Sequence, residues 1–296
     1  MASNEAIQMG AEVICSQIKD CLEFRTGCII GRNGTIELQT LLSYRKYKTF
    51  SSETIRVLEQ NAGVFPQDHT LLVEWVNEYL EANRISDIIA AGWYKPLEKQ
   101  EFDMLAEENK GGYACVPLRS LEPYYMASDK RWTSLLSGRK VCVVSSFTKT
   151  MSKQLINRHL IWDDAESFLP TNTHFSFVQT GYSPVLAQGS CGWNSCKSWK
   201  DAVSQVYNSV MQTDAEIVLI GCGGLGLPLA QRLKKSGKIT IVLGGAIQVL
   251  FGIKGDRWKN HSVISKFWND YWVYPSPEET PRGAHSVENA CYWNSR

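Results

Sequence analysis

The chain has 296 residues, of which 44% are hydrophobic, and its 31 Lys and Arg residues almost balance its 30 Asp and Glu residues. A chain of this length can bury a sizeable core, and its near-zero net charge gives no electrostatic reason to expect a nucleic-acid partner. The longest uncharged stretches of the C-terminal half, 217–231 and 239–253, are shorter than the roughly 20 apolar residues that a membrane-spanning helix needs. We therefore expect no membrane span.

The N-terminal residues and the cysteines indicate in which cellular compartment the protein is expected. Residues 1–20 contain acidic residues and lack the apolar block of a secretory signal. Nine cysteines are present without any C-x-x-C pair, which predicts reduced thiols and no zinc site. We therefore expect a cytoplasmic protein.

Hydrophobic periodicity predicts alternating helices and strands along the chain. The first helix is expected over 4–22, followed by an apolar strand at 27–31, a turn, and a helix over 35–44. Further helices are expected at 52–60, 69–83, 130–136, 149–160 and 197–213, and further strands at 87–91, 113–116, 140–146, 216–220 and 239–243. This alternation predicts one α/β domain over 1–296 with a Rossmann-like, mainly parallel sheet and helices on both faces.

Two segments are predicted to be irregular. Residues 170–199 are rich in Ser, Thr, Gly and Asn and are expected to form a long loop or lid. The tail from about 275 to 296 is expected to pack on the domain through Tyr292 and Trp293. Several of the ten tryptophans, Trp193 among them, lie in polar or glycine-rich sequence, where they serve either as boundary residues or as a platform for a carbohydrate or nucleobase.

The most informative motif is the glycine-rich turn 221–226, which follows a predicted strand and precedes a predicted helix. Such glycines let a backbone approach a diphosphate, and the helix N-terminus offers it free N–H groups. A tight turn without a ligand is the alternative interpretation. The candidate diphosphate-binding residues here are Gly221, Gly223, Gly224, Leu225 and Gly226.

The same motif occurs in nicotinamide-dependent oxidoreductases, which normally carry an acidic residue at the end of the next strand. Here that strand ends in Gly244-Gly245, and the next acidic residue is Asp256. The sequence therefore favours a diphosphate over a dinucleotide, and an NAD-dependent oxidoreductase is the less favoured alternative.

A second glycine turn is followed by cations. Gly245 and Gln248 precede Lys254 and Arg257, which suit the charge of a nucleoside diphosphate leaving group. The alternative is a solvated basic loop.

The turn after the first strand also carries candidate residues. Gly31, Arg32 and Gly34 lie in it, and Glu37 follows in the first turn of the next helix. Strand ends of this kind bind ligands in open α/β sheets, although a carboxylate there also simply favours the helix dipole.

Several segments together resemble the glycosyltransferases of the GT-D fold type, which occur in bacterial surface-polysaccharide loci and in large DNA viruses of algae. The resemblance covers nearly the whole chain, and its segments are GRNGTIELQTL, NAGVFP with Asn61, LEPYY, IGCGGLGLPLA, LGGAIQVLFGIKGDRW and VENACYW.

The resemblance implies a GT-D-type fold and transfer of a hexosyl or pentosyl group, usually from a UDP-sugar, to a glycan or glycoprotein acceptor. In the family motif, similar to R-x-G-D-x-E, Arg32, Gly34 and Glu37 match, whereas Thr35 replaces the aspartate. Arg32 and Glu37 are then the expected catalytic residues, with Asp87, Glu122 and Glu288 as the next candidates for the carboxylate.

Because the family's aspartate is missing, no cofactor is expected to be required. Mn²⁺ or Mg²⁺, held by Glu37 if by any residue, would assist at most. The alternative function is a non-catalytic protein of the same fold that binds a nucleotide or a glycan. The sequence leaves open the donor sugar, the acceptor and linkage, the stereochemistry, the metal dependence and the oligomeric state. If the chain is viral, as some proteins of the resembled family are, the expected compartment is the host cytoplasm.

Overall fold

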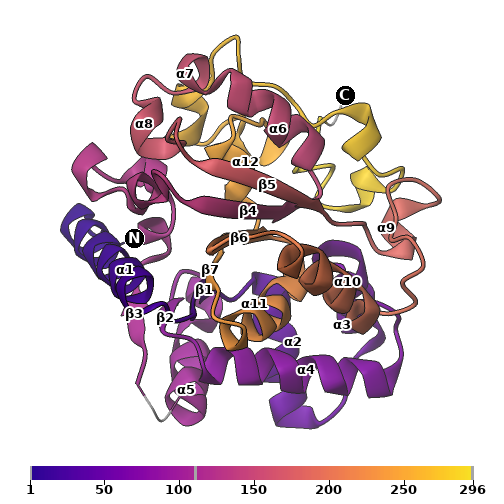
Figure 1. The fold of residues 1–296 in the computed structure, drawn as a ribbon. Helices are drawn as coiled ribbons and strands as arrows, with labels where there is room; N and C mark the ends of the chain where they lie inside the picture. Colours follow the sequence, from indigo (N-terminus) through magenta and orange to yellow (C-terminus); the bar gives the residue numbers. More distant parts are fainter. Residues whose placement is uncertain (1, 110–111, 295–296) are drawn as a thin grey trace.

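The structure is a computed structural model that describes residues 2–109 and 112–294. Within these residues, seven strands form one sheet in which every pair of neighbours is parallel, in the order β3-β2-β1-β7-β6-β4-β5 (Figure 1). The strands are β1 (Cys28–Arg32), β2 (Ile88–Ala90), β3 (Ala114–Val116), β4 (Lys140–Ser145), β5 (His174–Gln179), β6 (Ile217–Gly221) and β7 (Ile239–Val242). The predicted parallel α/β sheet is confirmed.

The central strands are buried on both faces, which explains why they are continuous apolar runs instead of alternating patterns. In β1, Ile30 pairs with Ile88 of β2 and with Ile241 of β7. Successive side chains point to opposite faces, so that Ile30 packs into one core and Ile29 into the other.

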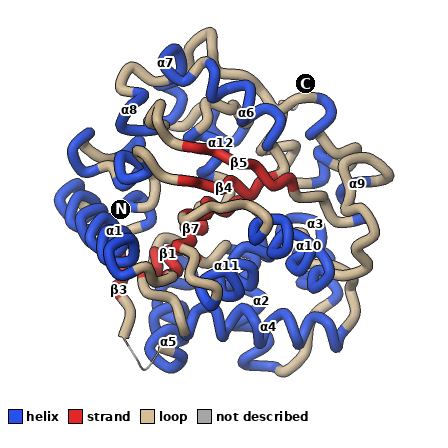
Figure 2. Tube along the Cα trace, viewed as in Figure 1, coloured by secondary structure: helices blue, strands red, loops and turns tan. Residues whose placement is uncertain are grey.

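Helices cover both faces of the sheet (Figure 2). One face packs against α2 (Thr35–Tyr47), α3 (Ser52–Ala62), α4 (His69–Arg84), α5 (Glu98–Glu108), α10 (Trp199–Met211) and α11 (Gly226–Lys235). The other packs against α1 (Asn4–Phe24), α6 (Thr148–Ile156), α7 (Arg158–Ile161), α8 (Ala165–Phe168), α9 (Pro184–Ala187) and α12 (Ala246–Leu250). No helix in the described part of the chain is both long and apolar enough to span a bilayer.

Local sequence explains where the long helices begin and end. Helix α1 begins after Ser3, whose side chain accepts a hydrogen bond from the Ala6 N–H, and it ends at Arg25 in the left-handed conformation. Its buried face carries Ile14 and Ile18, as the helical spacing predicted.

Three local predictions were wrong, and one helix was not predicted. Residues 170–199 were expected to be a loop, but they contain strand β5, which pairs only with β4 at the edge of the sheet and is therefore only half-buried. Helix α5 was not predicted. Residues 130–136 form short 3₁₀ turns, and the helix predicted over 149–160 is interrupted at Asn157 between α6 and α7.

The described C-terminal tail, 275–294, contains only 3₁₀ turns and is yellow in Figure 1. The carboxylate of Glu279 is buried and accepts hydrogen bonds from the Lys149 and Thr150 N–H groups, at 2.7 and 3.2 Å, at the start of α6. Trp293 is 2% exposed and packs edge-on against Phe147. The tail is thus fixed to the segment that follows β4.

Candidate functional site at the carboxyl edge of the sheet

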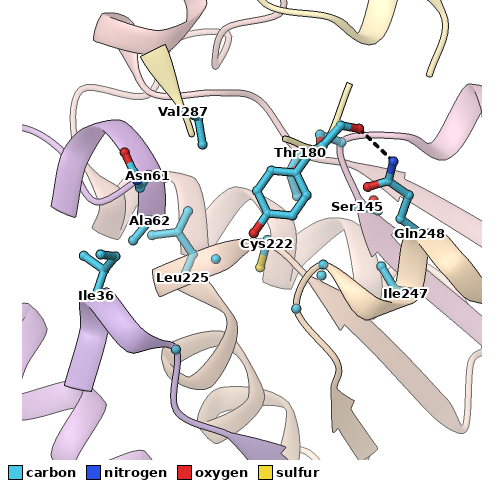
Figure 3. Close-up of a pocket in the computed structure, with 18 of the residues that line it drawn as sticks. Ile36, Asn61, Ala62, Ser145, Thr180, Cys222, Leu225, Ile247, Gln248 and Val287 are labelled. Carbon is cyan, nitrogen blue, oxygen red and sulfur yellow. Dashed lines mark hydrogen bonds between the residues drawn. The ribbon is translucent and has the colours of Figure 1, made fainter. Parts of the chain in front are cut away.

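A cavity of about 380 Å³ lies where the strands end. Its walls include Arg32 at the end of β1, Gly221 at the end of β6 and Val242 at the end of β7. Figure 3 shows Asn61 and Ala62 of α3 on one side and Ser145, Thr180 and Gln248 on the other, with Cys222 between them. This edge is where open α/β sheets bind ligands.

The glycine-rich turn after β6 is held close to the end of α3. Gly223 has a φ of +56°, and a Cβ atom there would lie 2.6 Å from the carbonyl oxygen of Ala62. A Cβ on Gly224 would lie 2.7 Å from a methyl of Val64, and the Trp75 indole donates to the Gly224 carbonyl at 2.9 Å. Packing therefore accounts for both glycines.

The glycine-rich turn after β6 nevertheless forms part of the cavity wall. Gly221, Gly223 and Leu225 line it, and α11 begins directly after them at Gly226. The predicted strand, glycine turn and helix are confirmed in this order. The N-terminus of a helix offers unpaired N–H groups and a favourable dipole to an anion.

The second glycine turn, after β7, supports the C-terminal tail. A Cβ on Gly245 would lie 2.6 Å from the ring of Tyr292, so glycine is needed for this contact. The amide of Gln248 donates to the carbonyls of Lys254 and Tyr292, both at 2.7 Å. Gln248 therefore holds the tail against one wall of the cavity.

Arg32 presents a cation to the cavity. Its guanidinium carbon lies 4.7 Å from the centroid of the Trp93 ring, and a Cβ on Gly244 would be 3.8 Å from the same carbon. Among the described residues, no carboxylate forms an ion pair with Arg32. Its charge is therefore available to an anionic ligand.

Arg257 also lines the cavity, but it is engaged by the tail. Its guanidinium lies 4.6 Å from the centroid of the Tyr292 ring and 3.3 Å from a carboxylate oxygen of Glu288. Lys254 does not line the cavity, because its ammonium lies against the ring of Trp268.

Glu37 is the third residue of α2 and is 7% exposed. Its carboxylate folds back over Gly34, where a Cβ atom would come within 2.0 Å of an oxygen of Glu37. Burial raises the pKa of this carboxyl, and its own backbone N–H and the charge of Arg32 oppose the rise. Glu37 thus lines the cavity as a largely enclosed group.

Three carboxyls line the cavity, those of Glu37, Glu122 and Glu288. Glu122 comes from the turn just before Pro123–Tyr125. Burial raises its pKa to about 7, against the opposing charges of Arg32 and Arg119. From the sequence, Glu122 was only one of the next candidates for the catalytic carboxylate, because no local sequence pattern shows that this turn lies near the end of β1.

Glu101 links the ends of β1 and β2 from beneath the cavity. Its fully buried carboxylate accepts hydrogen bonds from the Asn33 amide at 3.0 Å and from the Gly92 N–H at 2.9 Å. Burial raises its pKa, which these two donors oppose. The link fixes the turns that carry Arg32 and Trp93.

Divalent metals in proteins are commonly held by converging acidic, His or Cys side chains. Within 2–109 and 112–294, no group of three or more His, Cys, Asp or Glu side chains converges as metal ligands would. Both oxygens of Glu101 are already used, and Thr35 stands beside Glu37 where a second carboxylate would be needed.

The structure brings together most of the residues that the sequence predicted. Those that line the cavity are Arg32, Gly34, Glu37, Asn61, Gly221, Gly223, Leu225, Gly245, Gln248 and Arg257. Those that do not are Gly31, Gly224, Gly226 and Lys254. Gly31 and Gly226 are instead packing positions, at which a Cβ would lie 3.3 and 3.1 Å from side-chain atoms of Val242.

The fold defines an α/β protein with a Rossmann-like parallel sheet and a polar cavity at the carboxyl ends of its strands. No protein-family model, curated protein or solved structure matches the chain.

Proposed function

We propose that this protein is a glycosyltransferase that transfers a sugar from a nucleotide-sugar donor to a hydroxyl of a glycan. The resemblance of its motifs to the GT-D enzymes suggests that the donor is a UDP-sugar. The observation that carries the proposal is the cavity in which the glycine turn after β6, Arg32 and three carboxyls, those of Glu37, Glu122 and Glu288, meet. This set supplies donors and a cation for a diphosphate, and a proton acceptor for a hydroxyl.

The diphosphate is assigned to the side of the glycine turn. The N-terminus of α11 and the charge of Arg32, which pairs with no carboxylate in the described part of the chain, would stabilise the negative charge that develops on the departing nucleoside diphosphate. Arg257 also lines the cavity and adds positive charge, for which Glu288 competes.

Glu122 is assigned as the proton acceptor in preference to Glu37. In the reaction, the acceptor oxygen bonds to the anomeric carbon, the bond from that carbon to the phosphate oxygen breaks, and the hydroxyl proton passes to the carboxylate. A base with a pKa near the working pH serves best, and the pKa of Glu122 is about 7. The carboxylate of Glu37 is instead turned back over Gly34.

The test is incubation of the protein with a panel of nucleotide sugars, in which free nucleoside diphosphate is measured with and without glycan acceptors. We expect slow donor hydrolysis alone and faster release with an acceptor. Binding of UDP without turnover of any donor would support the non-catalytic alternative, whereas no binding of any nucleoside diphosphate would contradict the proposal.

A further inference from the structure

A second cavity, of about 550 Å³, adjoins the first. The two share three wall residues, Thr180, Gly181 and Trp193, which belong to the segment after β5 and to the loop before α10. One end of a ligand bound in the second cavity would therefore lie next to a ligand bound in the first cavity.

The shared wall is built to hold Trp193 in place. Tyr182 and Gly192 form a parallel bridge in which the Tyr182 N–H donates to the Cys191 carbonyl at 2.9 Å. A Cβ on Gly181 would lie 2.5 Å from the Trp193 nitrogen, so this approach requires glycine. Trp193 packs against the core on the α10 and α11 face of the sheet, and it is partly buried in the wall that the two cavities share.

The two cavities differ in charge. The charged side chains that line the second cavity are Lys149 and Glu278, and they pair with each other at 2.7 Å. The rest of its polar lining is neutral and includes the side chains of Gln179, Asn194 and Gln205. Such a lining offers hydrogen bonds without a net charge, so it suits a neutral polar ligand and not a phosphate.

We propose that the second cavity binds the acceptor, an uncharged oligosaccharide, and that the ring of Trp193 supports a sugar at its entrance to the first cavity. A sugar ring has an apolar C–H face that stacks on an aromatic ring and a polar edge that meets amide side chains. The assignment as acceptor rests on the proposed transfer reaction, whereas the binding of a glycan can be measured without it.

The experiment measures binding of the intact protein to a printed array of neutral oligosaccharides, followed by titration of the best ligands. Four variants are compared with the wild type: Trp193→Ala, Trp193→Phe, Asn194→Arg and Phe24→Ala. Phe24 is the matched control, since it is 68% exposed at the end of α1, next to the amino end of β1. Melting curves verify that each variant is folded.

We expect the wild type to retain neutral oligosaccharides, Trp193→Ala to weaken them at least tenfold and Trp193→Phe to weaken them about two- to threefold. Asn194→Arg, at an exposed position of the second cavity alone, tests the site without disturbing the core and should also weaken binding at least tenfold. Phe24→Ala should bind like the wild type. The thermal shift produced by UDP should stay within twofold in Asn194→Arg and Phe24→Ala, which do not change the first cavity.

The inference fails if the wild type retains no neutral oligosaccharide, or if Trp193→Ala and Asn194→Arg bind as tightly as the wild type. Failure of the proposed function is a different result. In that case glycans bind and depend on Trp193, but no nucleotide sugar is turned over.

Discussion

The guanidinium of Arg32, at the end of β1, lies 4.7 Å from the centroid of the ring of Trp93, which follows β2. Glu101 fixes this contact from below by hydrogen bonds to Asn33 and Gly92, the residues next to each of the two. The cation is thereby held on an aromatic face and not on a carboxylate. Such an arrangement keeps the charge available for a ligand, and the first prediction depends on it.

UDP should raise the melting temperature, because ligand binding adds about 2.7 kcal/mol at a hundredfold excess over the dissociation constant. Arg32→Ala should weaken UDP binding by about 1.5 to 3 kcal/mol through loss of charge-assisted hydrogen bonds. The control is Arg139→Ala, which removes a cation paired with Glu216 at the amino end of β4. Stabilisation by NAD and by no nucleoside diphosphate would instead support an oxidoreductase.

Glu122→Gln should lower transfer by about two to four orders of magnitude, since the amide cannot accept the proton. Glu37→Gln should lower it less than about tenfold, because the carboxyl of Glu37 is enclosed over Gly34. Rates at saturating donor, with UDP affinity measured in parallel, distinguish the two variants. The opposite ranking would return the catalytic role to Glu37.

The raised pKa of Glu122 predicts a stability difference that depends on pH. A carboxyl whose pKa rises to about 7 on folding favours the folded state most below its unfolded value of 4.5, and this advantage is lost as pH rises through 7. Glu122→Gln should therefore match the wild type near pH 4 and be more stable above pH 7, by at most about 3 kcal/mol. Denaturant unfolding at several pH values measures this, and a difference constant with pH would refute it.

Glu101→Ala should destabilise the protein by about 1 to 3 kcal/mol for each buried donor left without an acceptor, here the Asn33 amide and the Gly92 N–H. Glu98→Ala in the same helix is the control, since it removes only an exposed ion pair with Lys95, worth about 0 to 1 kcal/mol. Thermal unfolding compares the two. Equal losses would mean that the link between β1 and β2 is not important for stability.

Transfer activity should survive EDTA with less than about a tenfold loss, or roughly 1.4 kcal/mol of barrier. Thr35 stands where the R-x-G-D-x-E motif of the resembled GT-D enzymes has an aspartate, so the site has one carboxylate fewer than that motif. Arg32 and Arg257 can instead neutralise the departing diphosphate. Rates measured before and after dialysis against the chelator test this. Complete loss that Mn²⁺ restores would show that other oxygen ligands hold a metal.

The sequence by itself determined the features that depend on near neighbours in the chain. The apolar runs of the central strands, the helical spacing of Ile14 and Ile18, and the glycine turn between β6 and α11 were all predictable. Periodicity fixes which face of an element is buried, and a turn depends on the residues within it.

Tertiary structure alone decided which of these elements meet. The strand order, which places β1 beside β7 and β2, cannot be read from local patterns, and it brings Trp93 to Arg32. The same long-range packing brings Glu122 to the cavity and closes one wall with Tyr292. It also adds β5 at the edge of the sheet, a half-buried strand within a segment whose Ser, Thr, Gly and Asn content predicts a loop. Contacts between distant segments depend on how whole elements pack, and no short stretch of sequence contains that information.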